Sequence, residues 1–148
     1  MGDFFPEAGS HGYKDIPVGM TAQHDYVISQ AVYEHFLAGF HDYSPLHVDE
    51  AFARARGFSG KVMHGTLLNG FLSHFVGMHF PGKHSLLLAV ELRFTQPCYL
   101  GDVIQLDVKV RQKMDVQKVI VMDATFNNLT RNCIAARGRV QVMVGDSP

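Results

Sequence analysis

The sequence contains no tryptophan and only two cysteines, Cys98 and Cys133, among its 148 residues. A disulfide-stabilised fold needs more cysteine pairs, and these two residues lie too far apart to form a CxxC metal or redox site. None of the nine histidines belongs to an HExxH motif, so the pattern does not indicate a metal centre. We therefore expect a protein of the reducing cytoplasm that binds no metal and has no thiolate nucleophile.

Neither sign of charge is in excess, because 13 basic residues accompany 14 acidic ones. A net charge of −1 creates no field that would draw the protein to nucleic acid. The longest apolar run, residues 66–80, is interrupted by polar side chains and is shorter than the roughly 20 residues that span a bilayer. Residues 1–15 contain no basic segment followed by an apolar core, unlike a secretory signal. We expect neither nucleic acid nor a membrane as a partner.

The length suits one globular domain, and 47% of the residues are hydrophobic. This content is sufficient for a packed core and too high for a disordered chain. Residues 1–18 are rich in glycine, proline and aromatic side chains, and we expect an N-terminal arm that packs on the rest. Residues 19–148 are expected to form the domain itself.

Three segments have the apolar spacing of helices. Residues 29–40 predict the first helix and residues 48–56 a short second one. Between them, Pro45 removes a backbone donor and disfavours helix at the preceding residue, so residues 42–47 are expected to form a loop. Residues 64–79 predict a longer helix with an apolar stripe on one side and small residues on the other, and we expect it to be largely buried.

After Gly82 the hydrophobic period changes to two. Residues 102–111, 120–126 and 140–144 alternate apolar with polar side chains, which predicts an antiparallel meander with one face in solvent. Residues 84–95 add a fourth strand whose more continuous apolar character predicts a central position. One buried helix against an antiparallel sheet is an α+β architecture.

The loop at residues 42–47 carries a carboxylate, Asp42, and an imidazole, His47. Such a pair can hold one water molecule, with one group accepting a proton while the other donates one. Spacing alone also fits a helix-capping aspartate beside a solvated histidine. The pair is therefore a candidate acid–base site, and the spacing leaves open which residue is the acid.

A second candidate lies at the start of the long predicted helix, at His64 and Gly65. Because Gly65 has no side chain, its amide at a helix N-terminus can approach a ligand carbonyl, as in an oxyanion hole. Packing alone would also explain a glycine here. Ser73 lies about 12 Å further along the helix axis, so it can line a pocket or orient a side chain, or be a buried serine bonded to its own helix. The turn at residues 97–102 has the composition of a structural turn.

These features occur together in the order found in the MaoC-like hot-dog family, and the chain resembles its (R)-specific enoyl-CoA hydratases in particular. The family signature is D-x-N-P-x-H, a histidine–glycine pair opening the central helix, a serine within that helix, P-G-K, and a P-x-x-x-G-D turn. The residues that match it are Asp42, Pro45, His47, His64, Gly65, Ser73, Pro81, Gly82, Lys83, Pro97, Gly101 and Asp102. Ser44 stands where the family has asparagine, and this departure leaves open the rate and substrate preference more than the reaction type.

The resemblance implies a hot-dog fold, in which an antiparallel sheet wraps a long central helix, and a homodimer. It also implies an acyl thioester of CoA or acyl carrier protein along the subunit interface, and no cofactor or metal. Asp42, His47 and Gly65 would be catalytic. The residues that would contact substrate are Ser44, His64, Leu72, Ser73 and Val76. The implied reaction is syn addition of water to a trans-2-enoyl thioester, giving a (3R)-hydroxyacyl thioester, or its reverse.

Two other functions remain open. A thioesterase of the same fold places a carboxylate on the central helix, and residues 64–80 contain none. A non-catalytic acyl-thioester-binding protein is favoured only by Ser44, and it would not need Asp42 and His47 on one turn.

Overall fold

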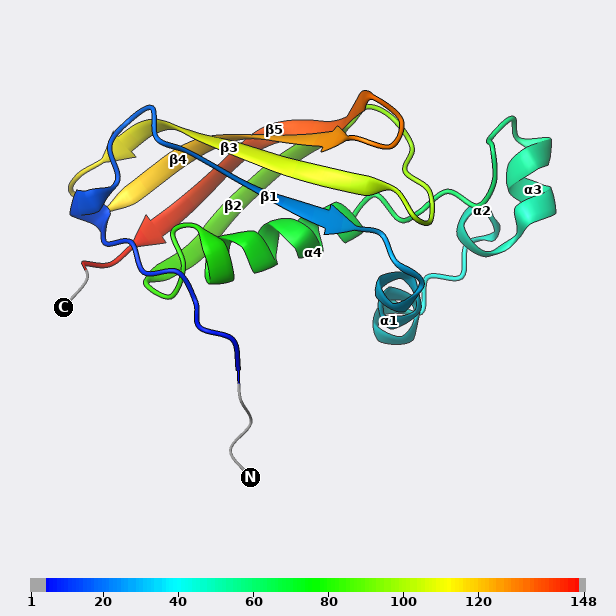
Figure 1. Cartoon of the computed structure of the whole chain (residues 1–148), viewed down its shortest axis with the longest axis horizontal. Helices are drawn as coiled ribbons and strands as arrows, with labels where there is room; N and C mark the ends of the chain where they lie inside the picture. Colours follow the sequence, from blue (N-terminus) through cyan, green and yellow to red (C-terminus); the bar gives the residue numbers. More distant parts are fainter. Residues whose placement is uncertain (1–4, 147–148) are drawn as a thin grey trace.

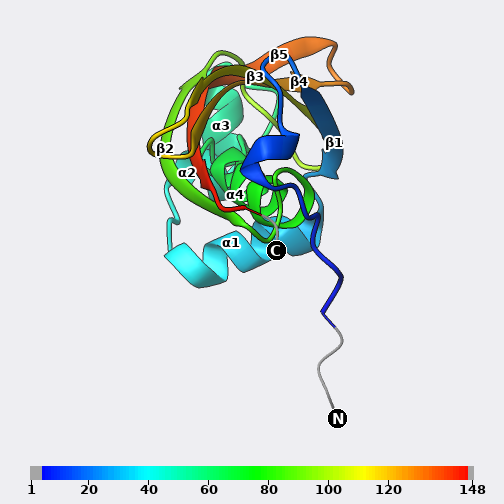
Figure 2. The ribbon, with the colours of Figure 1, turned by 90° about the vertical axis from the view of Figure 1, so that its left-hand side faces the viewer.

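The computed structural model describes residues 5–146 and has two layers. One layer is a five-stranded antiparallel sheet with the strand order β1-β3-β4-β5-β2. The other is helix α4, which lies under the sheet, while α1, α2 and α3 gather at one end of the molecule (Figure 1). Viewed at right angles, the sheet curls around α4 (Figure 2). The predicted α+β class and the wrapped-helix arrangement are confirmed.

The strands are β1 Thr21–Val27, β2 Ser85–Phe94, β3 Val103–Met114, β4 Val119–Asn128 and β5 Cys133–Val144. The helical elements are η1 Tyr13–Asp15, α1 Gln30–Phe40, α2 Pro45–Val48, α3 Glu50–Ala55, α4 Leu67–His74 and the π-helical η2 Phe75–His79. The predicted first helix is therefore confirmed as α1, and Ser29 caps it by accepting a hydrogen bond from Val32 N at 3.2 Å.

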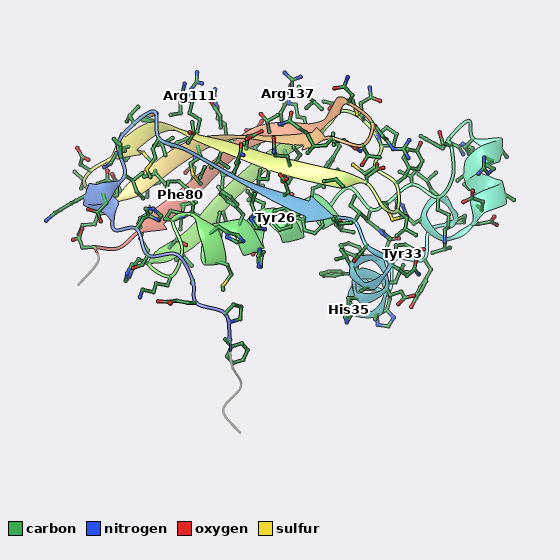
Figure 3. All side chains as sticks on the ribbon, viewed as in Figure 1. Tyr26, Tyr33, His35, Phe80, Arg111 and Arg137 are labelled. Carbon is green, nitrogen blue, oxygen red and sulfur yellow. The ribbon has the colours of Figure 1, made fainter. Side chains whose placement is uncertain are left out.

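The core lies between the concave face of the sheet and α4. The apolar residues of β3 and β4 alternate with polar ones, so their inner side chains, such as Leu106 and Phe126, are fully buried. Leu72 of α4 and Phe75 of η2 pack into the same cluster. The outer face carries charged side chains, among them Arg111 and Arg137, which point away from α4 (Figure 3). The predicted meander with one solvated face is confirmed.

The predicted central position of the strand at residues 84–95 is wrong. It is β2, and it forms an edge of the sheet with β5 as its one partner strand. Its apolar run does not reflect burial on both faces, because several of its large apolar side chains remain exposed in the single chain. These are Leu86, Leu88, Val90 and Phe94. The continuous apolar sequence of β2 is thus compatible with a strand at the edge of the sheet whose exposed side chains another chain covers.

Three local predictions need correction. Residues 42–47 are not entirely a loop, because Pro45–Val48 form one helical turn with proline at its first position, where its missing N–H costs nothing. The predicted second helix is divided at Asp49, whose side chain caps α3 by accepting from Phe52 N at 3.0 Å. The central helix begins at Leu67 rather than residue 64, and becomes π-helical at Phe75.

Strand β1 was not predicted, because its inward side chains are Ala22, His24 and Tyr26 and do not form an apolar pattern. The N-terminal arm does pack on the domain: Tyr13 and Ile16 are buried in the core. Residues 1–4 of that arm lie outside the described residues. Within residues 5–146, no helix has both the length and the apolar character needed to cross a bilayer.

Candidate active site

The structure brings Asp42 and His47 together at the end of the molecule where α1, α2 and α3 gather (Figure 1). Helix α1 ends at Phe40, and the left-handed backbone of the next residue, His41 (φ 56°), turns the chain sharply before Asp42. One carboxylate oxygen of Asp42 accepts a hydrogen bond from Ser44 N at 3.2 Å. The other, Oδ2, lies 4.0 Å from His47 Nε2. At this separation one water molecule can hydrogen bond to both groups, since each bond needs about 2.8 Å.

The protonation of the His47 ring follows from its other hydrogen bond. Nδ1 lies 2.7 Å from the main-chain oxygen of Val62, which can only accept, so Nδ1 carries the proton and donates it. In the neutral ring, Nε2 is therefore unprotonated, and its lone pair is available on the side of Asp42. The His47 side chain is 16% exposed and that of Asp42 is 50% exposed, so solvent reaches the pair.

The side chain of His64 holds the main chain of Asp42 through a hydrogen bond. It is almost fully buried, and its Nε2–H donates to the main-chain oxygen of Asp42 at 2.9 Å. The rings of His64 and His47 lie 3.9 Å apart with 32° between their planes. The same Nε2 is 3.7 Å from Asp42 Oδ2, so the imidazole adds a favourable dipole beside the carboxylate.

Asp42, His47 and His64 offer ligand atoms within 4.8 Å of one another, which is close enough to consider a metal ion. The nitrogen of His64 that faces Asp42 already carries a proton and donates it to a main-chain oxygen, so it has no free lone pair for a metal. The Nδ1 of His47 likewise donates its proton to the main-chain oxygen of Val62, which leaves Nε2 as the one nitrogen of that ring with a free lone pair. These contacts fit a hydrogen-bonded acid–base pair better than a metal centre.

Gly65 lies in the turn directly before α4, two residues before the first helical residue. Its amide N–H has no hydrogen-bond partner among residues 5–146, and the residue is exposed. A Cβ atom at this position would lie 3.3 Å from the ring of Phe94, so the close approach of that ring favours glycine. The free N–H near a helix N-terminus is therefore available to a ligand oxygen.

A cavity of about 310 Å³ reaches His47, His64 and Gly65, whereas Asp42 is not among its lining residues. It is lined by Ile28, His47, Val62, Met63, His64, Gly65, Leu68, Phe94, Thr95, Gln96, Pro97 and Cys98. The lining is mostly apolar, with the imidazole of His47 and the amide of Gly65 among its few polar groups, as in sites for small organic ligands. Burial, with a smaller effect from the charge of Asp102, raises the pKa of the Cys98 thiol to about 11, so it stays protonated and is a poor nucleophile.

The remaining predicted residues lie differently. Ser73 is exposed on α4 in the single chain, so the interpretation as a buried serine is wrong; its side chain has no hydrogen bond within the described range. Leu72 and Val76 are core residues and do not line this cavity. Ser44 precedes α2 without a side-chain capping hydrogen bond. The turn that ends in Asp102 is structural, because its buried carboxylate accepts hydrogen bonds from Tyr99 N at 2.9 Å and from Asn128 at 2.7 Å.

The structure also identifies two residues that the sequence pattern did not single out. Phe94 covers Gly65, and Tyr33 of α1 donates a hydrogen bond from its hydroxyl to the main-chain oxygen of His47 at 2.7 Å. The one available signal for Tyr33 was a polar ring on the apolar side of a predicted helix. Phe94 lies 29 positions after Gly65 in the sequence, and no local pattern links the two residues, so only the folded chain reveals its role.

Comparison with known proteins shows the family of the chain. The family model for the MaoC-like domain matches residues 16–132. The chain belongs to the MaoC-like family. The (R)-specific enoyl-CoA hydratase of Aeromonas caviae is 34% identical over 97 residues, which cover 66% of this chain and 72% of the relative. That of Rhodospirillum rubrum is 28% identical over 134 residues, which cover 90% and 92%.

Solved structures of the MaoC-like family superpose closely. An unliganded R-hydratase from Pseudomonas aeruginosa has a TM-score of 0.86 at 25% identity, covering 95% of this chain and 89% of that one. The (R)-hydratase from A. caviae has a TM-score of 0.81 at 27% identity, with 88% and 98% covered. The predicted resemblance and hot-dog fold are confirmed.

Proposed function

We propose that this MaoC-like protein is an (R)-specific enoyl-CoA hydratase, equivalently a (3R)-hydroxyacyl thioester dehydratase, and hence a hydro-lyase. The observation that carries the proposal is the 4.0 Å approach of Asp42 Oδ2 to His47 Nε2 beside the free amide of Gly65. The names of the relatives from A. caviae and R. rubrum support the same reaction.

The hydrogen bond from His47 Nδ1 to Val62 supports His47 as the proton carrier. In the proposed hydration, the water oxygen bonds to C3 of the enoyl thioester while one water proton moves to His47 Nε2. The electrons of the double bond move toward the thioester oxygen, and the imidazolium then returns its proton to C2. Asp42 accepts a hydrogen bond from the second water hydrogen and stabilises the imidazolium. Because one side chain takes and returns the proton on one face, the addition is syn.

The Gly65 amide supplies the second requirement of this chemistry. C3 is electrophilic only where negative charge on the thioester oxygen is stabilised, and one well-placed donor contributes about 3 kcal/mol to that stabilisation. Gly65 and His47 line the same cavity, so a thioester oxygen at the amide would place the double bond near the imidazole. Adding water across the double bond oxidises C3 and reduces C2 equally, so there is no net change of oxidation state and the proposed reaction requires no redox cofactor.

The direct test is hydration of crotonyl-CoA by the purified protein, followed as loss of the absorbance of the conjugated thioester. We expect turnover by the wild type, and loss of at least about 100-fold in kcat for Asp42→Asn and His47→Gln. His35 of α1 is exposed and does not line the cavity, so His35→Gln is the matched control and should keep wild-type turnover. A wild type inert toward short, medium and branched enoyl thioesters on both carriers would disprove the proposal.

The thioesterase alternative receives no support from the site, since neither α4 nor η2 contains a carboxylate. Release of free CoA from saturated acyl-CoA would nevertheless establish it. The non-catalytic alternative predicts tight binding of acyl-CoA without turnover and without an effect of Asp42→Asn.

We further propose a homodimer formed through the edge strand β2. Its apolar side chains are exposed in the single chain, and so is the small-residue side of α4, including Gly70 and Ser73. A second copy that covers this region would bury both surfaces and close the sheet edge. Ser73, which is exposed in the single chain, would then face acyl substrate at the interface, as the family resemblance implies.

CoA or acyl carrier protein remains the proposed carrier of the acyl thioester. An Arabidopsis thaliana relative named 3-hydroxyacyl-[acyl-carrier-protein] dehydratase, mitochondrial, is 38% identical over 64 residues, 43% of this chain and 37% of the relative. Both cysteines are free thiols, which supports a reducing cytoplasm as the proposed location.

A further inference from the structure

Tyr33 is the one residue of α1 that is fully buried, with 4% of its surface exposed. A buried phenol needs a hydrogen-bond partner, and the hydroxyl of Tyr33 finds one in the main-chain oxygen of His47 at 2.7 Å. Burial also raises the pKa of Tyr33, so its hydroxyl stays protonated and acts as a donor at neutral pH. The phenol thus joins α1 to α2 at the residue that carries the proposed proton transfer.

Few contacts within helix α2 stabilise its position. It comprises one turn, contains no buried residue, and has no side-chain cap at Ser44. The last carbonyls of any helix have no partner within it, and the His47 carbonyl is one of these. Tyr33 satisfies this carbonyl from one side of α2. On the other side, Val62 accepts from the His47 ring at 2.7 Å and donates its N–H to Leu46 O at 3.1 Å.

His47 is consequently held by two hydrogen bonds, one from Tyr33 to its main-chain oxygen and one from its ring Nδ1 to Val62. Removing the Tyr33 hydroxyl would leave His47 held by the Nδ1 hydrogen bond and by the contact of its ring with His64, and would remove a hydrogen bond that joins the main chain of α2 to α1. A displacement of about 1 Å at a reacting group can lower the rate by about 100-fold. Tyr33 does not line the cavity, so this effect would reach the reaction only through His47.

We propose that Tyr33 is a positioning residue that holds the His47 imidazole in register with Asp42 for proton transfer. The proposal rests on the proposed hydratase function. It assigns the hydroxyl of Tyr33 a contribution to kcat and none to substrate binding.

The test is Tyr33→Phe, which removes one oxygen atom and keeps the buried ring. We expect kcat for crotonyl-CoA hydration to fall about 10- to 100-fold, with KM within about twofold of the wild type. In NMR spectra of the wild type, the His47 Nδ1–H proton should be protected from exchange by its hydrogen bond, and it should broaden or disappear in Tyr33→Phe.

Tyr13→Phe is the matched control. Tyr13 is equally buried, and its hydroxyl donates to Asp115 Oδ1 at 2.8 Å, on the opposite end of the sheet from the site. This variant should lose a comparable amount of stability while kcat and the His47 proton signal stay unchanged. A similar fall in kcat for both variants would show a general loss of stability and overturn the proposal.

The remaining outcomes separate this inference from the proposed function. An inactive wild type would refute the hydratase proposal, whereas an active wild type with unchanged kcat and His47 signal in Tyr33→Phe would refute the role of Tyr33 alone. A rise in KM without a change in kcat would also refute it. Should Tyr33→Phe fail to fold, the exchange of the Tyr33 hydroxyl proton with solvent is measured in the wild-type protein. Slow exchange would support the hydrogen bond to His47, and fast exchange would contradict it.

Discussion

Replacement of Gly65 by alanine tests whether the free amide acts as the oxyanion donor. The backbone of Gly65 does not have a positive φ, so alanine introduces no backbone strain. The added methyl group would lie 3.3 Å from Cγ and Cδ1 of Phe94, a few tenths of an ångström closer than ordinary contact. Phe94 lies at the end of β2 and is 49% exposed in the single chain, where its ring can move outward, and we expect a loss of less than about 1 kcal/mol in the free energy of unfolding of the chain.

The expected effect on catalysis is much larger. The methyl group and the displaced ring narrow the approach to the amide in a cavity of only about 310 Å³. Loss of one oxyanion donor lowers kcat by about 100- to 1,000-fold, which sets the upper limit for Gly65→Ala. The assay is crotonyl-CoA hydration together with urea unfolding of the same samples.

Gly39 of α1 offers a matched control, because a Cβ atom there would meet no heavy atom within 4 Å. Gly39→Ala should keep wild-type kcat and raise helix stability slightly. If Gly65→Ala also keeps wild-type kcat, the amide of Gly65 does not stabilise the developing charge, and the reasoning fails.

Two further predictions concern stability and assembly. Burial, and then the neighbouring His24 and His74, lower the pKa of His79 from its ordinary value of 6.5, so the unfolded chain binds this proton more readily. Protonation of His79 therefore does not lower the free energy of unfolding above pH 6.5, and lowers it as the pH falls below 6.5. In urea unfolding across that range, the free energy of unfolding should fall less steeply with pH for His79→Gln than for the wild type. An equally steep fall in both proteins would contradict the assignment. For assembly, Leu88→Lys places a charge on the exposed edge of β2, and light scattering should show monomers where the wild type forms a dimer. The control is Val116→Lys, in a loop where the side chain is 93% exposed, which should leave the dimer intact. If Leu88→Lys still forms a dimer, the interface lies elsewhere.

Local periodicity was sufficient to predict much of this fold. The alternation of Leu106 and Val108 with polar neighbours predicted β3, because inward and outward side chains of a strand differ in burial wherever one face is solvated. Strand β1 was missed since its inward positions hold His24 and Tyr26, whose burial comes from contact with the central helix: the Tyr26 ring stacks on Phe71 at 4.5 Å.

The sequence by itself determined which residue types stand on the turn at 42–47 and before the central helix, and the family resemblance that they carry. Only the tertiary structure decided how they meet. The proton on His47 Nδ1 is assigned by Val62, and the main-chain oxygens of Asp42 and His47 are held by His64 and Tyr33. These bonds join residues 14 to 22 positions apart through main-chain atoms, which every residue type possesses. No pattern of side chains along the chain encodes such partners, so they appear only when the helices and the sheet have packed.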